Sequence, residues 1–268
     1  MNHQPIFTKK YLNSKLNNFS LNKIEKVEKK KVILDNWIQA IKSGRIINTN
    51  EKSQQADFMN RIFGDVLGYK YMDNYKWNLH KEYGVIGGYT VDGALGYFWM
   101  NNGNIESDVR AVIELKDAKT DLDKKQKRNE DNRTPVEQAF SYASKAGSSC
   151  KWVIVSNFLE IRLYNSSDEG HYELFNISEL LNKPDNLIHF FFLLHSDRLI
   201  NQDGNSYINK LYKERQKEEE NITNEFYDNY RNKRLNLFDH LKNQNPDIDE
   251  LIIFNKSQKL IDRLIFVF

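Results

Sequence analysis

The sequence has little cysteine, little proline and no long hydrophobic run, and these shortages exclude several classes of protein. One cysteine, Cys150, allows neither a disulfide within the chain nor a zinc site built from several cysteines. The longest apolar stretch, LIHFFFLLH at 187–195, is too short to cross a bilayer, and the N-terminus shows no signal-peptide core. We therefore expect a cytoplasmic protein without a membrane partner.

An excess of charge of one sign is also missing, because 39 Lys and Arg residues face 37 Asp and Glu residues. Composition alone therefore does not demand nucleic acid as a partner. With 268 residues, 40% of them hydrophobic, the chain is long enough for a globular domain with a core and an accessory segment. The six histidines show no metal-ligand spacing, and Cys150 is expected to be a small buried residue.

Hydrophobic periodicity predicts helices at both ends of the chain. Apolar residues recur at helical spacing over 20–45 and again over 52–66. From about residue 205 onward the pattern is helical and highly charged, with a sparse apolar stripe. We expect a helical N-terminal segment over 1–48 and a helical connector over 201–268.

The middle of the chain, 49–200, changes period and is expected to form one α/β domain. Apolar patterns predict three strands, a helix and two further strands, in the order 76–84, 89–100, 105–116, 134–147, 150–157 and 159–165. The sequence NNGN at 101–104 predicts a hairpin between the second and third strands, because Asn and Gly accept the positive φ of a tight turn. Thr134 is the expected cap of the helix, with Pro135 in its first turn.

The third strand carries a glutamate and a lysine in an otherwise apolar run, AVIELKDAKT at 111–120. Because side chains alternate faces along a strand, Glu114 and Lys116 point the same way. A symmetric two-residue turn would set Asp92 opposite Ile113, whereas one bulge or an odd-length loop sets Asp92 opposite Glu114. Asp92, Glu114 and Lys116 are therefore expected to converge at one end of the hairpin.

Two carboxylates held this close repel each other unless a cation lies between them. Mg²⁺ takes oxygen ligands, so Asp92, Glu114 and the backbone carbonyl of Leu115 are the expected ligands, and Mn²⁺ is expected to substitute. The ion would polarise a phosphodiester, while Lys116 orients or deprotonates the attacking water. The alternative is a surface ion pair between Glu114 and Lys116 on a strand that leaves the core.

Asp92, followed at a distance by Glu114, Leu115 and Lys116, resembles the signature of the PD-(D/E)xK nucleases, with Val91 where the signature has proline. The predicted order of helix, three-stranded meander, helix and further strands resembles the core of that fold. The resemblance implies an α/β, restriction-endonuclease-like domain with helical additions at both ends.

The helix after the signature carries Gln138 and Tyr142, whose spacing resembles the QxxxY motif of the exonuclease-like branch of that superfamily. Residues at i and i+4 share one helix face, and the resemblance implies that both side chains position the site. The run ELKDAKTDL … TPVEQAFSYA … WVIVSNFLEIRLYN is most similar to the N-terminal nuclease domain of single-chain, type IIG-like restriction–modification enzymes. The resemblance implies double-stranded DNA as substrate and a transient dimer on DNA.

In those enzymes a helical connector leads to an adenine-specific methyltransferase, which uses S-adenosylmethionine, and then to a target-recognition region. This sequence has no methyltransferase motif, since NPDI at 245–248 is not the NPPY-type tetrapeptide. The chain also stops inside an apolar helical run, RLIFVF. We therefore expect the front part of a longer enzyme, with S-adenosylmethionine bound only in an absent downstream domain.

A basic cluster follows the signature and consists of Lys119, Lys124, Lys125, Lys127 and Arg128. Beside a nuclease site these residues would contact DNA phosphates, whereas elsewhere they would form a solvated loop. The acidic residues of the same stretch, Asp117, Asp121 and Asp123, either supply a second metal or form a solvated loop, which we favour. Glu51 or Asp57 of the upstream helix is a candidate for one more ligand.

Two other functions remain open. The chain could be a DNA-binding or scaffolding module that keeps the nuclease fold without cutting, although such a module has no reason to keep the three charged residues. A nuclease of the same fold that acts on RNA or on single strands is the other. Metal-dependent nicking that is lost in Lys116→Ala while DNA binding persists would exclude the module, and a panel of substrates would separate the two nucleases.

Overall fold

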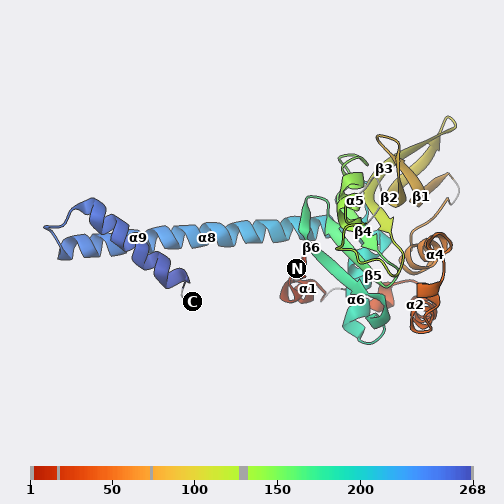
Figure 1. Cartoon of the computed structure of the whole chain (residues 1–268), viewed down its shortest axis with the longest axis horizontal. Helices are drawn as coiled ribbons and strands as arrows, with labels where there is room; N and C mark the ends of the chain where they lie inside the picture. Colours follow the sequence, from red (N-terminus) through yellow and green to blue (C-terminus); the bar gives the residue numbers. More distant parts are fainter. Residues whose placement is uncertain (1–2, 17–18, 73–74, 127–131, 267–268) are drawn as a thin grey trace. The chain divides into compact units, whose positions relative to one another are not determined.

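The structure, a computed structural model, describes residues 3–16, 19–72, 75–126 and 132–266 (Figure 1). The chain divides by its internal contacts into two units, Met1–Lys210 and Leu211–Phe268. No helix among the described residues is both long enough and apolar enough to cross a membrane.

The first unit is built on a six-stranded sheet whose strands lie side by side in chain order. The strands are β1 (Lys76–Val85), β2 (Tyr89–Asn101), β3 (Asn104–Leu115), β4 (Trp152–Ser156), β5 (Glu160–Asn165) and β6 (Asp168–Asn176). All neighbouring pairs are antiparallel except β3 and β4, which are parallel. Parallel neighbours need a crossover, and helix α5 (Pro135–Ala143) lies in the connection between these two strands.

The mixed α/β architecture and the first five strands agree with the sequence prediction, whereas β6 was not predicted. The sequence of β6, DEGHYELFN, is mostly polar, and most of its residues are exposed or half-buried. It is an edge strand of the sheet, and edge strands tolerate such residues because one side of the strand meets solvent. Hydrophobic alternation is therefore a weak signal at this position.

Helices precede the sheet: α1 (Lys9–Leu16), α2 (Val27–Lys42), α3 (Arg45–Asn48), α4 (Glu51–Phe58) and the π-helical η2 (Met59–Val66). The helix predicted over 20–45 starts later than expected. Ser20 caps only a short 3-10 turn, η1 (Leu21–Lys23), and Lys26 then adopts a left-handed φ of 54° before α2 begins. The helical prediction over 52–66 is confirmed, although the second half has the wider π-helical turn.

Helices cover both faces of the sheet. Gly93 lies directly against the Met59 side chain of η2, so close that a Cβ at Gly93 would clash with it. The next residue, Ala94, belongs to the core cluster that contains α5. Successive residues of a strand point to opposite faces, so η2 and α5 pack on opposite sides of β2.

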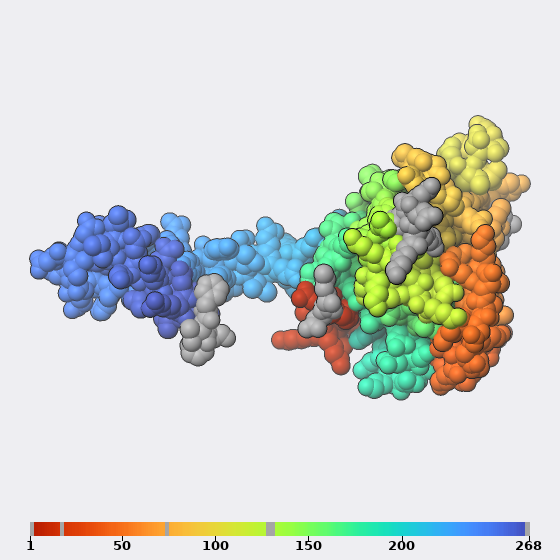
Figure 2. Space-filling view, viewed as in Figure 1, coloured from red at the N-terminus to blue at the C-terminus, as the bar shows by residue number. Residues whose placement is uncertain are grey.

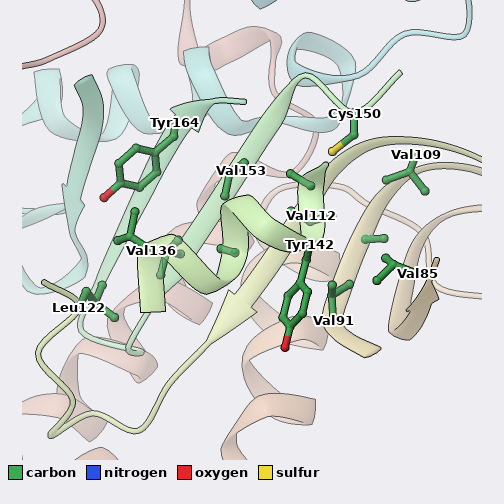
Figure 3. Close-up of a cluster of buried hydrophobic side chains, with 14 of the residues drawn as sticks. Val85, Val91, Val109, Val112, Leu122, Val136, Tyr142, Cys150, Val153 and Tyr164 are labelled. Atoms are coloured by element: carbon green, nitrogen blue, oxygen red, sulfur yellow. The ribbon is translucent and has the colours of Figure 1, made fainter. Parts of the chain in front are cut away.

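The core under α5 joins valines of the strands to the apolar side of the helix, as Figure 3 shows. Val112 and Val153 meet Val136 and Tyr142 in this cluster, and all four are buried. Complete burial of one such aliphatic side chain contributes about 1.5–3 kcal/mol. The start of α5 is as predicted: Thr134 Oγ1 accepts from Glu137 N at 3.0 Å, and Glu137 Oε2 accepts from Thr134 N at 2.7 Å.

The remaining helices of the first unit follow the sheet: η3 (Ile177–Glu179), α6 (Pro184–Leu194), α7 (Ser196–Leu199) and the start of α8 (Tyr207–Gln244). The second unit holds the rest of α8 and α9 (Glu250–Phe266), which pair through Phe238 and Phe254 at 5.9 Å between ring centroids. The helical prediction for this part of the chain is confirmed.

Candidate functional site

The hairpin turn between β2 and β3 is the two-residue turn that the sequence predicts. Asn101 pairs with Asn104, and the two residues between them have left-handed φ values of 48° at Asn102 and 81° at Gly103. Two positive φ values define the turn type that matches the twist of the flanking strands. The tip of this hairpin, yellow in Figure 2, projects from the first unit.

One β-bulge lies between this turn and the predicted site. The register of β2 against β3 shifts between Leu95 and Gly96, so that Arg110 has no partner opposite it. Gly96 is required here, because a Cβ would clash with the Asp108 carbonyl oxygen and lie 2.9 Å from Val109 Cα. The sequence allowed for one bulge, and the structure contains it.

The bulge decides which residues meet. It places Gly93 opposite Ile113, so Asp92 and Glu114 are the next residues of the two strands. The Asp92 side chain turns toward β3 and accepts a hydrogen bond at Oδ2 from Leu115 N at 2.6 Å. Asp92 is therefore tied directly to the strand that carries the rest of the signature.

Glu114 and Lys116 form an ion pair inside the protein. Their exposed fractions are only 3% and 4%, and Lys116 Nζ donates to Glu114 Oε1. Lys116 N also donates to Ser156 O at 2.9 Å, which extends the pairing of β3 with β4 past Leu115. The alternative of a surface ion pair is therefore wrong, because the pair is buried. Charged residues are rarely buried unless they are paired, and even a buried pair has a large desolvation cost, so this pair is weak evidence for a purely stabilising role.

Burial controls the ionisation of Asp92. It raises the pKa of the Asp92 carboxyl, and the negative charge of Glu51 acts in the same direction. The Leu115 N–H, the charge of Lys116 and a hydrogen bond from Gln55 oppose this rise. An added cation would favour the ionised carboxylate in the same way that Lys116 does.

Gln55 of α4 links two of these carboxylates. Its Nε2 donates to Asp92 Oδ1 at 3.3 Å and to Glu51 Oε1 at 3.2 Å. Glu51 therefore reaches the site through an amide, whereas Asp57 is held by Arg61 of η2 at 2.5 Å. Sequence reasoning missed Gln55, although its position one turn after Glu51 was a signal that could have drawn attention to it.

The donor atoms around Asp92 decide which metal ion the site could hold. Within the described parts of the chain, no group of three or more His, Cys, Asp or Glu side chains is arranged to hold a metal ion. The neighbouring donors are the Asp92 and Glu114 carboxylates and the Leu115 backbone, and all of their acceptor atoms are oxygens. Hard oxygen donors fit Mg²⁺ better than they fit a soft metal.

Gln138 and Tyr142 of α5 are joined to each other, as their spacing allows. Gln138 Nε2 donates to Tyr142 Oη at 2.8 Å, and Gln138 Oε1 accepts from Gln126 Nε2 at 3.1 Å. Figure 3 shows the Tyr142 ring beside Val91, the residue before Asp92, so this face of α5 lies near the start of β2. Tyr142 is at once a core residue and a hydrogen-bond partner. No pattern in the sequence pointed to Gln126.

The predicted basic cluster is only partly within the described residues, since Lys127 and Arg128 lie outside them. Lys119 and Lys125 are exposed on the segment after β3, and exposed Lys124 forms an ion pair with Asp121 at 2.9 Å.

The acidic residues of the same segment shape its backbone and anchor it. Asp117 Oδ1 accepts from Lys119 N at 2.8 Å, and Asp121 Oδ1 accepts from Asp123 N at 3.0 Å. Asp123 holds the Arg162 guanidinium of β5 through two bonds of 2.7 and 3.1 Å. These bonds give each of the three carboxylates a partner within the protein.

A hollow of about 200 Å³ lies against Asp92 on the α4 side. Lys52, Gln55, Tyr71 and Lys81 are among its lining residues. Sequence reasoning missed this surface, because the lysines come from α4 and β1 and share no motif.

Comparisons of the chain with models of protein families, with curated proteins and with solved structures found no match.

Proposed function

We propose that the first unit is a Mg²⁺-dependent DNA endonuclease domain of the restriction type, with a PD-(D/E)xK core. The observation that carries this proposal is the hydrogen bond from Leu115 N to Asp92, which ties Asp92 to the residue between the paired Glu114 and Lys116. Paired carboxylates beside a lysine suit metal-assisted hydrolysis of a phosphodiester. The order of helix, three antiparallel strands, crossover helix and parallel fourth strand supports the same assignment.

In this proposal Asp92, Glu114 and the Leu115 carbonyl hold the ion, which supplies polarisation of the phosphodiester and a lower pKa for bound water. Lys116 orients or deprotonates the attacking water and stabilises negative charge on the phosphate. Burial keeps the Lys116 ammonium beside Glu114. Interactions between charges are stronger in this buried place than in bulk water. Gln138 and Tyr142 position the site from α5.

The proposed substrate is double-stranded DNA, with Mn²⁺ able to replace Mg²⁺. Lys119, Lys124 and Lys125 contact its phosphates, and each such contact adds salt-sensitive affinity. Sequence recognition resides in a methyltransferase and target-recognition region of the full-length protein, and two copies of the domain meet transiently on DNA.

Cleavage of a supercoiled plasmid in Mg²⁺ or Mn²⁺ tests this proposal. Asp92→Asn and Lys116→Met remove the two charges with little change in volume. Asp35→Asn and Lys42→Met are matched controls, because both side chains are exposed on α2. We expect metal-dependent nicking by the wild type and by both controls, and a loss of at least about 100-fold in the two site variants, in line with the loss of a major catalytic group.

Nicking that survives in Asp92→Asn, or that persists in EDTA, would contradict the proposal. If the wild type is silent, calorimetry with Mg²⁺ and Mn²⁺ comes next. Metal binding that is lost in Asp92→Asn would retain the site as a metal centre. If the wild type shows no cleavage and also no metal binding, the catalytic proposal is excluded. A panel of duplex DNA, single-stranded DNA and RNA identifies the preferred nucleic acid.

A second candidate is a module that binds DNA without cutting it. The Glu114–Lys116 ion pair favours this candidate, because each charge has a partner of the opposite sign within the fold. The two candidates differ in one outcome: the module retains duplex binding in the wild type and shows no metal-dependent nicking with any substrate of the panel.

A further inference from the structure

The hollow beside Asp92 contains a lysine, Lys81, whose charge has no carboxylate partner among the described residues. Lys81 Nζ donates to the neutral Asn60 Oδ1 at 2.5 Å and lies 4.2 Å from the centre of the Tyr71 ring. Within the part of the chain that the structure describes, Lys81 takes part in no ion pair. Burial lowers its pKa, so an anion at this point would stabilise the charged form.

The size of the hollow limits what it can hold. About 200 Å³ is small beside the volume of roughly 300–1,000 Å³ that is usual for sites of small molecules and cofactors. A single anionic group that belongs to a larger molecule outside the hollow fits this space better than a whole cofactor does. Lys52, an exposed residue of α4, adds a second positive charge to the lining.

Two carboxylates, Asp92 and Glu82, also line the hollow and balance the two lysines. Glu82 is exposed and, among the described residues, forms no ion pair with either lysine. Asp92 belongs to the proposed metal site, so a divalent cation there would leave the lining with a net positive charge. The hollow therefore becomes more attractive to an anion when the neighbouring site is loaded.

We propose that this hollow binds a backbone phosphate of duplex DNA next to the phosphate that is cut, with Lys81 as its main contact and Lys52 as a second. The proposal rests on the proposed function for its ligand. Asn60 and Tyr71 hold the Lys81 side chain in place, and an ammonium has three N–H donors, of which Asn60 takes one. Lys81 is a binding residue in this scheme and takes no part in the chemical step.

Equilibrium binding of a fluorescent DNA duplex in EDTA tests this proposal without any cleavage. Lys81→Met keeps the apolar stem on Tyr71 and removes the charge, Lys81→Arg keeps the charge, and Lys76→Met is a matched control at the start of β1. For Lys81→Met we expect weaker binding at low salt. The negative slope of log K against log salt should become less steep by about 0.9, the value for one phosphate contact on B-DNA. Lys81→Arg and Lys76→Met should keep the wild-type slope.

A Lys81→Met variant with the wild-type slope and affinity would overturn the subsite, as would a wild type that does not bind duplex DNA. A folded variant is required, so thermal melting is measured for each protein. Because no metal is present, the result does not depend on catalysis. Loss of slope in Lys81→Met, together with a wild type that neither cuts the plasmid nor binds Mg²⁺ or Mn²⁺, would keep the phosphate subsite and reject the nuclease.

Discussion

The buried ion pair between Glu114 and Lys116 allows a stability measurement that separates its structural role from its proposed catalytic role. Lys116→Met leaves the Glu114 carboxylate in a place that is only 3% exposed, without the ammonium beside it. Removal of one partner of a buried pair costs about 3–5 kcal/mol, because the remaining charge stays away from water. Glu114→Gln should cost a similar amount for the same reason.

The double variant Glu114→Gln/Lys116→Met removes both charges and keeps most of the volume. Replacement of a whole buried pair by apolar residues of similar volume is often neutral or stabilising, by about 1–4 kcal/mol, and a neutral Gln beside Met is closer to that case than a lone buried charge is. The double variant should therefore recover most of the stability that each single variant loses. Cleavage should not recover, because both proposed functional groups are gone.

Urea unfolding followed by tryptophan fluorescence measures these differences. All four tryptophans, Trp37, Trp77, Trp99 and Trp152, lie in the first unit, so the signal reports on the unit that contains the pair. Since a domain is stable by only about 5–15 kcal/mol, losses of this size shift the midpoint strongly. Single variants within about 1 kcal/mol of the wild type would refute the argument from burial, since surface pairs contribute about that much or less. A double variant that still cuts would refute the catalytic roles.

Three further variants test the geometry around the pair. Asp92→Asn should melt at a higher temperature than the wild type at pH 7, and the difference should vanish below about pH 4. The reason is that burial raises the folded-state pKa of Asp92, so its ionisation lowers stability as the pH rises through that pKa, and no penalty remains where the carboxyl is protonated in both states. Gly96→Ala should destabilise the first unit by about 1–3 kcal/mol, seen in the urea midpoint, because the new Cβ clashes with Asp108 O at the bulge. Tyr142→Phe should cost about 1–3 kcal/mol by the same assay, because buried Gln138 loses a hydrogen-bond partner at 2.8 Å.

Each of these expectations has an opposite outcome. An Asp92→Asn variant that melts below the wild type at pH 7 would mean that the bonds from Leu115 and Gln55 outweigh the effect of burial. An unchanged midpoint in Gly96→Ala would mean that the hairpin pairs without the bulge. If Tyr142→Phe loses no more stability than Tyr83→Phe, whose hydroxyl bonds Ser107 on the surface, the Gln138–Tyr142 bond makes no contribution.

Local sequence signals predicted the parts of the fold that depend on neighbouring residues. The turn at Asn102 and Gly103 and the Thr134 cap depend on backbone preferences within a few residues, and both agree with the structure. The late start of α2 and the strand β6 were missed for different reasons. Lysine rarely adopts a positive φ, so nothing in the sequence indicated the left-handed backbone at Lys26. β6 is a polar edge strand without a clear hydrophobic alternation.

The site was predicted in part for the same reason. Alternation along one strand placed Glu114 and Lys116 on one side, and the count of residues across the turn left Asp92 opposite either Ile113 or Glu114. The bulge decided between these registers, through the close approach of Gly96 to β3. That approach is a contact between two strands, which a count along the chain leaves open.

By itself, the sequence determined the elements that local preference controls: the strands and helices with clear periodicity, the turn, the cap, and the residue types of the proposed site. Only the tertiary structure decided that the Glu114–Lys116 pair is buried, that Gln55 links Glu51 to Asp92, and that Lys81 lies in the same hollow as Asp92. Burial and charge balance depend on which distant segments pack together. The links of α4 to Asp92 and to the hollow follow from the place of α4 beside β1 and β2, and that packing sets the environment of the Asp92 carboxyl.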